Sequence, residues 1–242
     1  MHATRPSRRW LPIFAGLAAS FASLAGCADG LVPEVRSLNP WIRQQWAQDE
    51  QFGPTYHRKV ADLAALRSSS ASLAAPEQER VALELAKRLQ DEQNPVLRSE
   101  LVRTMGALAS PTAISTIQAS LTDQHPQVRI AACRALGRNS SEENAQALGN
   151  VLTSDSDLDV RIAAARALGQ LTDPAAIGAL RPALDDNDAG LQLVAMESLR
   201  TLTGRGQYGN HVPTWREYLD GGDPSPPPGP SLVESLRKYS YW

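Results

Sequence analysis

Side chains that could carry catalysis or bind a metal are few in this 242-residue chain. No His-Glu pair and no His-x3-His or Cys-x2-Cys spacing is present to bind a transition metal. No Gly-x-Ser-x-Gly elbow, Walker loop or dinucleotide fingerprint is present to hold a nucleophile or a phosphate. We therefore expect no catalytic residue, cofactor, metal or small-molecule substrate, and we interpret the chain as a protein that is not an enzyme. The histidines and cysteines are His2, Cys27, His57, His125, Cys133 and His211.

One acidic segment has a composition that could bind calcium. Asp155-Ser-Asp-Leu-Asp159 places three carboxylates at alternate positions, as a calcium-binding loop does. However, Val160 stands where that loop needs a glycine, and Arg166 stands where it needs a final acid. We therefore interpret the segment as a solvated loop between structural units and predict no metal site there.

The N-terminal residues have the features of an export signal. Residues 1–10 include three arginines, and Leu11 to Gly26 is a short run of apolar and small residues. A basic region, a short apolar region and small residues before a cleavage point are typical of a secretory signal peptide. The run is too short and too rich in small residues for a membrane span of about 20 residues. We therefore predict that residues 1–26 are removed.

The end of this signal identifies a candidate lipid-attachment site. Leu24-Ala-Gly-Cys27 resembles the bacterial lipobox, in which the cysteine becomes the lipidated first residue of the mature protein. The resemblance implies that Cys27 anchors the protein to a membrane of the cell envelope, facing the periplasm or the exterior. Several acyl chains on one cysteine would make that anchor durable, because each buried CH₂ contributes about 0.8 kcal/mol. An ordinary signal peptide cleaved near Ala25 is the alternative.

Charge and composition narrow the class of partner. Residues 1–26 carry three of the 24 basic residues and no acidic residue, so their removal leaves 21 basic against 26 acidic residues and a net charge of −5. Such a chain has no basic surplus to attract phosphate backbones, so we expect no nucleic-acid partner. The chain is 42% hydrophobic but only 5% aromatic, and this favours closely packed helices over sheets.

Two nearly identical decapeptides organise the chain. Val128–Gly137 and Val160–Gly169 agree at nine of ten positions and begin 32 residues apart. A fixed period of this length is typical of stacked supersecondary units that share one continuous core. The single difference is Cys133, which stands where the next unit has Ala165. We interpret Cys133 as an inert small side chain on a helix face rather than a nucleophile.

Each unit is predicted to contain two antiparallel helices, which we call helix A and helix B. Apolar and small residues recur at i, i+3, i+4, i+7 and i+8 along helix A, so one stripe faces a core. A glycine follows the last apolar residue of three A helices, and we expect it to turn the chain with a positive φ. The first aligned residues of helix A are Leu97, Val128, Val160 and Leu191, and the three glycines are Gly106, Gly137 and Gly169.

The pattern Asp-x4-Val-Arg-x2-Ala-Ala-x-Ala-Leu-Gly resembles HEAT repeats, specifically the HEAT-like repeats of phycobilisome lyases. The resemblance implies an all-α fold, a right-handed α-solenoid, in which a repeated Asp and a repeated Arg form a ladder between repeats. In this sequence the matching residues are Asp123, Arg129, Asp155 and Arg161. The first unit departs from the spacing, with Glu92 as a substitute for the aspartate, and the fourth has Gln192 instead of arginine.

Segments of other composition flank the repeats. Terminal units of solenoids are atypical because they must close an open core, so we expect helical caps on both sides. A proline-rich stretch near the C-terminus is typical of a stiff linker. The predicted order is a signal peptide (1–26), a tether (27–37), an N-terminal helical cap (38–90), HEAT-like repeats (91–205), a C-terminal cap (206–222), a linker (223–230) and an amphipathic helix (231–242).

Two functional hypotheses remain open at this point. The first is a non-enzymatic, membrane-tethered scaffold whose helical surfaces bind a protein partner in the cell envelope. It rests on a complete structural explanation of the repeated residues beside the absence of catalytic motifs. The alternative, implied only by the resemblance, is a phycobilin-lyase-like enzyme or pigment chaperone that uses the same repeat fold.

Overall fold

The computed structural model describes residues 44, 48 and 53–227, and it divides the chain into two compact units, Met1–Arg58 and Lys59–Trp242. In the first unit, Gln44 and Gln48 are helical and exposed. The predicted signal peptide, the lipid-attachment residue Cys27, the tether and the C-terminal amphipathic helix lie outside the described residues. Residues 53–227 contain the helices that test the predicted repeats.

Every regular element in the described part of the chain is helical, and this confirms the expected all-α solenoid. None of these helices combines the length and the apolar character that crossing a membrane requires. In chain order they are α4 (Tyr56–Ser69), η3 (Ser70–Ser72), α5 (Ala75–Asp91), α6 (Pro95–Met105), α7 (Pro111–Ala119), η4 (Ser120–Thr122), α8 (Pro126–Leu136), α9 (Glu142–Ser154), α10 (Leu158–Leu168), α11 (Ala175–Ala179), α12 (Arg181–Asp185), α13 (Ala189–Thr203), η5 (Gly206–Tyr208) and α14 (Val212–Leu219).

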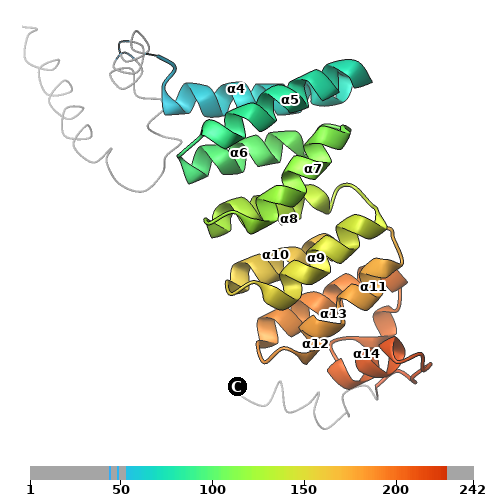
Figure 1. Cartoon of the computed structure of the whole chain (residues 1–242). Helices are drawn as coiled ribbons and strands as arrows, with labels where there is room; N and C mark the ends of the chain where they lie inside the picture. The colour runs from blue at the N-terminus through green and yellow to red at the C-terminus, as the bar shows by residue number, and fades with distance from the viewer. Residues whose placement is uncertain (1–43, 45–47, 49–52, 228–242) are drawn as a thin grey trace, which may run out of the picture. The chain divides into compact units, whose positions relative to one another are not determined.

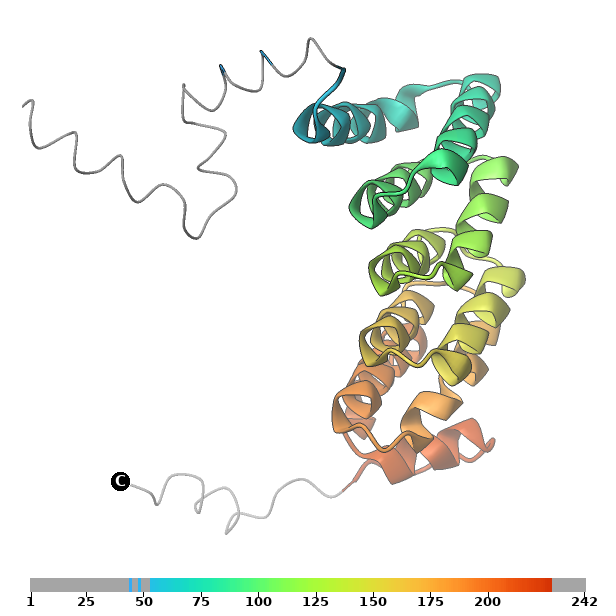
Figure 2. The same ribbon diagram turned by 60° about the vertical axis from the view of Figure 1, so that its left-hand side comes forward.

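The second unit is a stack of helix pairs in two rows (Figure 1). The A row contains α6, α8, α10 and α13, and each packs on the next. The B row contains α5, α7, α9, α11 with α12, and α14 (Figure 2). The part of α4 in this unit lies on α6, where the Thr104 hydroxyl meets the carbonyl of Leu63. The helices predicted as caps therefore continue the two rows of the repeats.

Capping residues set where the helices begin. Asn94, Ser110, Ser141 and Asp188 precede α6, α7, α9 and α13, and each side chain accepts a hydrogen bond from a backbone N–H of the first turn. Proline follows the cap of α6, α7 and α8, where its missing N–H costs nothing. The chain thus enters these helices at defined residues, which keeps the repeats in register.

The core is continuous and consists mainly of leucine and alanine. On α8 the predicted stripe is buried, with Val128, Ala132 and Leu136 at no more than 1% exposure. Cys133 and its counterpart Ala165 are fully buried as well. Small side chains at these positions let consecutive A helices approach closely, so each repeat completes the core of its neighbours.

The expectation of a positive φ at the glycines of helix A is wrong. Gly106, Gly137 and Gly169 have φ values of −63°, −60° and −65°, which any residue adopts. A Cβ on Gly106 would lie 2.7 Å from the Cβ of Ala135, and a Cβ on Gly169 would lie 2.6 Å from that of Ser198. These positions need glycine because the next A helix passes too closely for a side chain.

Helix B of the third unit is not continuous as predicted. It ends at Ala179 and resumes at Arg181, so the element consists of α11 and α12. Pro182 explains the break, because it has no N–H to donate to the carbonyl four residues earlier. Near the N-terminal end of the second compact unit, α4 runs to Ser69 and the 3-10 turn η3 follows it directly.

The last helix of the B row closes the described end of the core with aromatic side chains. Trp215 on α14 is fully buried and donates its indole N–H to the Gly209 carbonyl at 3.0 Å. Its ring packs edge to face on Tyr208, with 5.1 Å between the ring centroids. Gly204 and Gly209 have φ values of +69° and +53°, so glycine is required for these turns.

Candidate functional site

The repeated arginines of the A row join consecutive repeats. Arg129 on α8 donates Nε and Nη2 to the carboxylate of Asp155 at 2.7 and 2.8 Å, in a bidentate pair with the next unit. Its Nη1 donates to the Asp123 carbonyl of its own unit at 2.9 Å. One guanidinium therefore fixes two loops at once, with 14% of the Arg129 side chain exposed.

On both sides of this ion pair, the equivalent arginine faces the aspartate of the next unit. Arg98 donates to both carboxylate oxygens of Asp123 at 2.9 Å. Arg161 lies 3.6 Å from an Asp186 oxygen, too far for a hydrogen bond, and its buried Nε has no partner. The rungs therefore run from the arginine of one unit to the aspartate of the next, and the rung nearest the C-terminus is the loosest of the three.

The two ends of the ladder keep only half of the contact. Glu92 accepts a hydrogen bond from the Asn94 N–H, as Asp123 does from His125, so it occupies the aspartate position of the first unit. Gln192 donates to the Asp186 carbonyl at 2.7 Å, which reproduces the arginine's contact with its own loop. The ladder guanidiniums are engaged by protein atoms, so they do not offer a ligand site.

The ladder perturbs the pKa values of its carboxyl groups. Burial opposes ionisation of Asp155, but the hydrogen bonds from Arg129 and from the Asp157 backbone outweigh it and hold the pKa of that carboxyl below its usual value. The pKa of Asp123 is lowered for the same reasons by Arg98. Both carboxylates are therefore part of the fold in their charged form.

Cys133, His125 and His211 have structural roles in the repeats. Burial, followed by the charge of Asp155, raises the pKa of Cys133 to about 12, which removes the thiolate that a nucleophile needs. His125 and His211 cap α8 and α14, where Nδ1 accepts a backbone hydrogen bond. No sequence pattern had indicated these histidine caps. Among residues 53–227, no three His, Cys, Asp or Glu side chains gather as metal ligands would.

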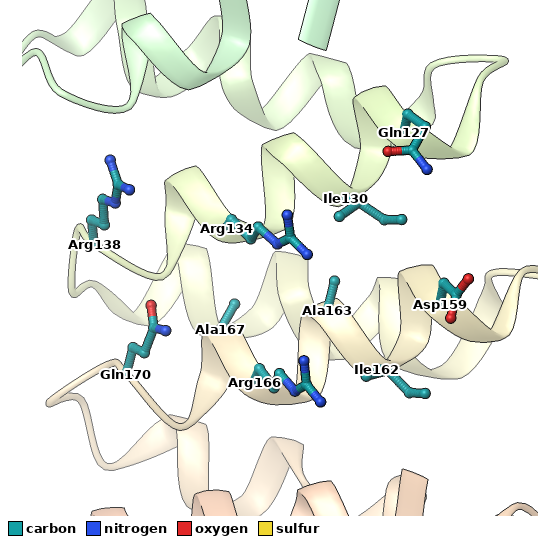
Figure 3. A pocket seen from close by; sticks show the side chains of 10 residues that line it. All are labelled: Gln127, Ile130, Arg134, Arg138, Asp159, Ile162, Ala163, Arg166, Ala167 and Gln170. Carbon is teal, nitrogen blue, oxygen red and sulfur yellow. The ribbon is translucent and has the colours of Figure 1, made fainter. Parts of the chain in front are cut away.

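A groove between α8 and α10 is the strongest candidate for a binding site. It has a volume of about 520 Å³ and runs along the exposed side of the A row (Figure 3). Arg134 and Arg166 extend over it from the two helices, and Arg138 lies at its α8 C-terminal end. The lining residues are Gln127, Ile130, Arg134, Arg138, Asp159, Ile162, Ala163, Arg166, Ala167 and Gln170.

The arginines of this groove differ from the ladder arginines. Arg134, Arg138 and Arg166 are exposed, and in the described part of the chain none forms a hydrogen bond or an ion pair. Arg103, the equivalent of Arg134 in the preceding unit, is instead neutralised by Glu100 at 2.7 Å. The equivalent position in the unit after Arg166 is an acid, Glu197. Unneutralised positive charge at this position is thus confined to α8 and α10.

A second groove extends the first toward α6. It has a volume of about 350 Å³ and shares Arg134 and Arg138 with the groove between α8 and α10. Arg67 and Arg103 line its other side, and both pair with Glu100, at 3.1 and 2.7 Å. Arg67 and Arg103 share this one carboxylate, so the second groove keeps a net positive charge, and its two arginines without an ion pair, Arg134 and Arg138, lie where the two grooves meet.

The sequence contained a signal for this groove that its repeat pattern concealed. Arg134 and Arg166 occupy the seventh position of the two decapeptides, where the repetition itself suggests a structural role. They fall outside the core stripe of helix A, and no acid stands three or four residues before or after either one on its helix. An exposed helical arginine without such a partner is free to bind a ligand.

Comparison with known proteins identifies the repeats. A family model described as HEAT repeats matches residues 82–157 and 117–200, so this part of the chain consists of HEAT repeats. Among solved structures, the complex of CpcE and CpcF of phycocyanin lyase from Nostoc sp. PCC7120 is similar over 65% of this chain and 95% of that chain. The identity is 16% and the TM-score is 0.44. No curated protein matches the chain.

Proposed function

We infer that this protein is a non-enzymatic HEAT-repeat scaffold that binds a protein partner. The observation that supports this function is that the arginines of helix A occupy two different environments. The ladder arginines, such as Arg129, are engaged between repeats, whereas Arg134 and Arg166 face solvent over a groove without partners. Helical repeats expose such extended surfaces, and surface arginines are enriched where proteins bind one another.

The proposed scaffold acts at a membrane of the cell envelope, facing the periplasm or the exterior. The support is the sequence Leu24-Ala-Gly-Cys27 at the end of an apolar segment, which resembles a lipobox. A lipid on Cys27 would hold the repeats near the membrane, and residues 28–37 would act as a tether. The partner is then a protein that is exposed on the same side of that membrane.

Crosslinking in intact cells tests the two parts of this proposal. An affinity-tagged full chain is crosslinked, purified and analysed by mass spectrometry, beside a Cys27→Ser variant. With the unchanged chain we expect one crosslinked partner and a lipid-modified N-terminal peptide that begins at Cys27. With the variant we expect less of the crosslinked partner and no lipid-modified peptide. Failure to crosslink any envelope protein would refute the scaffold, whereas an unmodified Cys27 would refute only the anchor. We also expect no absorbance change on incubation with bilins, which separates the scaffold from a pigment chaperone.

A further inference from the structure

We propose that the groove between α8 and α10 binds an acidic segment of the partner protein, with carboxylates on Arg134, Arg138 and Arg166. This inference rests on the scaffold function proposed above and specifies the chemistry of what the scaffold binds. The groove combines free cations, an apolar floor and one acidic end, and each of these features constrains the ligand.

The free cations select carboxylates. Three exposed guanidiniums without ion pairs surround one groove on a chain whose overall charge is −2. Arg134 and Arg166 lie one above the other, from adjacent helices (Figure 3). Like charges at close quarters repel, so an anion between them is bound by both and relieves that repulsion. Guanidinium forks bind carboxylates in bidentate geometry, which favours Asp and Glu side chains.

The floor of the groove selects an apolar side chain beside those acids. Ile130 from α8 and Ile162 from α10 line it together with Ala163 and Ala167. Ile162 is half-buried, and α8 and α10 pack directly on one another beneath it. Ile130, Ala163 and Ala167 are buried, at 8%, 6% and 1% exposure, so a leucine or valine of the bound segment would mainly cover the exposed part of Ile162.

The acidic end gives the groove a direction. Asp159 and Gln127 lie at the end away from Arg138, and Asp159 has no ion pair among the described residues (Figure 3). Asp159 and Arg166 are seven residues apart on α10, which corresponds to about 10.5 Å along a helix. An extended peptide covers that distance in about three residues, at roughly 3.3 Å per residue. We therefore expect a basic residue about three positions from the acidic cluster, with an apolar residue between them.

These features favour a peptide over an anionic membrane surface. A membrane presents a broad and nearly uniform negative surface, against which Asp159 would be repelled. The apolar floor is recessed between two helices, where an extended peptide fits and a flat surface does not. A bound peptide satisfies the cationic end, the floor and the acidic end together.

Fluorescence anisotropy tests the proposal with defined probes. The protein is the full chain carrying Cys27→Ser, so that no lipid contributes to binding. One labelled peptide contains a lysine, a leucine and three glutamates in that order over seven residues, and its counterpart has glutamines in place of the glutamates. Vesicles with anionic phospholipid headgroups serve as a third probe. The double variant R134E/R166E is compared with R200E, which reverses an exposed arginine of α13 outside the groove.

We expect the acidic peptide to bind, R134E/R166E to weaken it at least tenfold, and R200E to leave it within twofold. Added salt should weaken binding, because the contact is ionic. Equal binding of the glutamine peptide would overturn the proposal. An acidic peptide that binds R134E/R166E as tightly as the unchanged chain would overturn it as well. Vesicle binding that requires Arg134 and Arg166, without peptide binding, would assign the groove to a membrane instead. R134Q/R166Q, which adds no acid, keeps the test valid if the charge reversal unfolds the protein.

The same variants separate this inference from the scaffold function. If R134E/R166E crosslinks the envelope partner as well as the unchanged chain does, the scaffold stands and the groove is not its binding site. If the acidic peptide binds at the groove but no envelope protein is crosslinked, the ligand chemistry stands and the scaffold function fails.

Discussion

Arg129 and Asp155 connect two consecutive repeats through a bidentate ion pair, with Nε and Nη2 of the arginine at 2.7 and 2.8 Å from the two carboxylate oxygens. The third nitrogen of Arg129 donates to the Asp123 carbonyl at 2.9 Å. The exposed fractions of the Arg129 and Asp155 side chains are only 14% and 8%. A buried pair of this kind has little net value over apolar side chains, but removing one partner leaves an unpaired charge.

Arg129→Ala should therefore destabilise the fold by about 3 kcal/mol, because Asp155 and the Asp123 carbonyl lose their donor together. Chemical denaturation followed by circular dichroism measures this as a shift of the urea midpoint. Arg134→Ala is the matched control, since Arg134 lies on the same helix, is exposed and has no partner. Its effect should stay within about 0.5 kcal/mol. Equal losses in the two variants would mean that the ladder does not stabilise the stack.

The depressed pKa of Asp155 predicts how stability depends on pH. A carboxyl group whose pKa is lower in the folded than in the unfolded chain binds fewer protons when folded. The contribution of Asp155 to folding stability is fully present above pH 3.8, the ordinary pKa of this group. It is lost as the pH falls through the lower pKa of the folded protein. Urea midpoints measured from neutral pH down to about pH 2.5 should fall more steeply for the unchanged protein than for Asp155→Asn. Parallel curves would show that Asp155 is not a source of the acid sensitivity.

Gly169 tests the close approach of consecutive A helices. A Cβ at this position would lie 2.6 Å from Ser198 Cβ and 2.9 Å from its Cα, so the backbone of α13 would have to move. Gly169→Ala should destabilise by about 1–3 kcal/mol, as overpacking of a filled core does. Gly178→Ala on α11 is the control, because nothing lies within 4 Å of a Cβ there. It should stabilise by up to about 1 kcal/mol through helix propensity, and a thermal melt of both variants decides the sign.

Much of the fold was predictable because the same residue pattern recurs in each repeat. The apolar stripe of helix A and the period of the units follow from side-chain type and spacing alone. The negative φ at Gly169 did not, because glycine allows either a left-handed turn or a close contact, and only Ser198 of the next repeat decides between them. The pairing of Arg129 with Asp155 across units likewise depends on stacking, which a local spacing does not contain.

The groove was less predictable than the fold. Arg134 and Arg129 lie five residues apart in the same decapeptide, and both have the pattern of repeat signatures. They differ because a rotation of five residues along the helix turns Arg134 away from the neighbouring loops that engage Arg129. Whether an acid from another element neutralises such an arginine, as Glu100 does for Arg67, is a property of the tertiary structure.

Cys133 should behave as an unreactive thiol in the folded protein. It is fully buried on α8, and burial raises its pKa to about 12, so almost no thiolate exists at mildly alkaline pH. In the full chain carrying Cys27→Ser, Cys133 is the single thiol. A disulfide reagent should then react slowly in buffer and at once in denaturant. Rapid reaction without denaturant would show that α8 opens readily.

The rung between Arg161 and Asp186 should contribute much less than the rung at Arg129. Its closest nitrogen–oxygen distance is 3.6 Å, and Arg161 Nε is buried without a partner, which is itself a cost. Arg161→Gln would remove that nitrogen and could keep the contact with the loop carbonyl, as Gln192 does in the next unit at 2.7 Å. We expect Arg161→Gln to change stability by less than about 1 kcal/mol, against about 3 kcal/mol for Arg129→Gln. Equal losses in urea denaturation would mean that Arg161 pairs with Asp186 in solution as tightly as Arg129 pairs with Asp155.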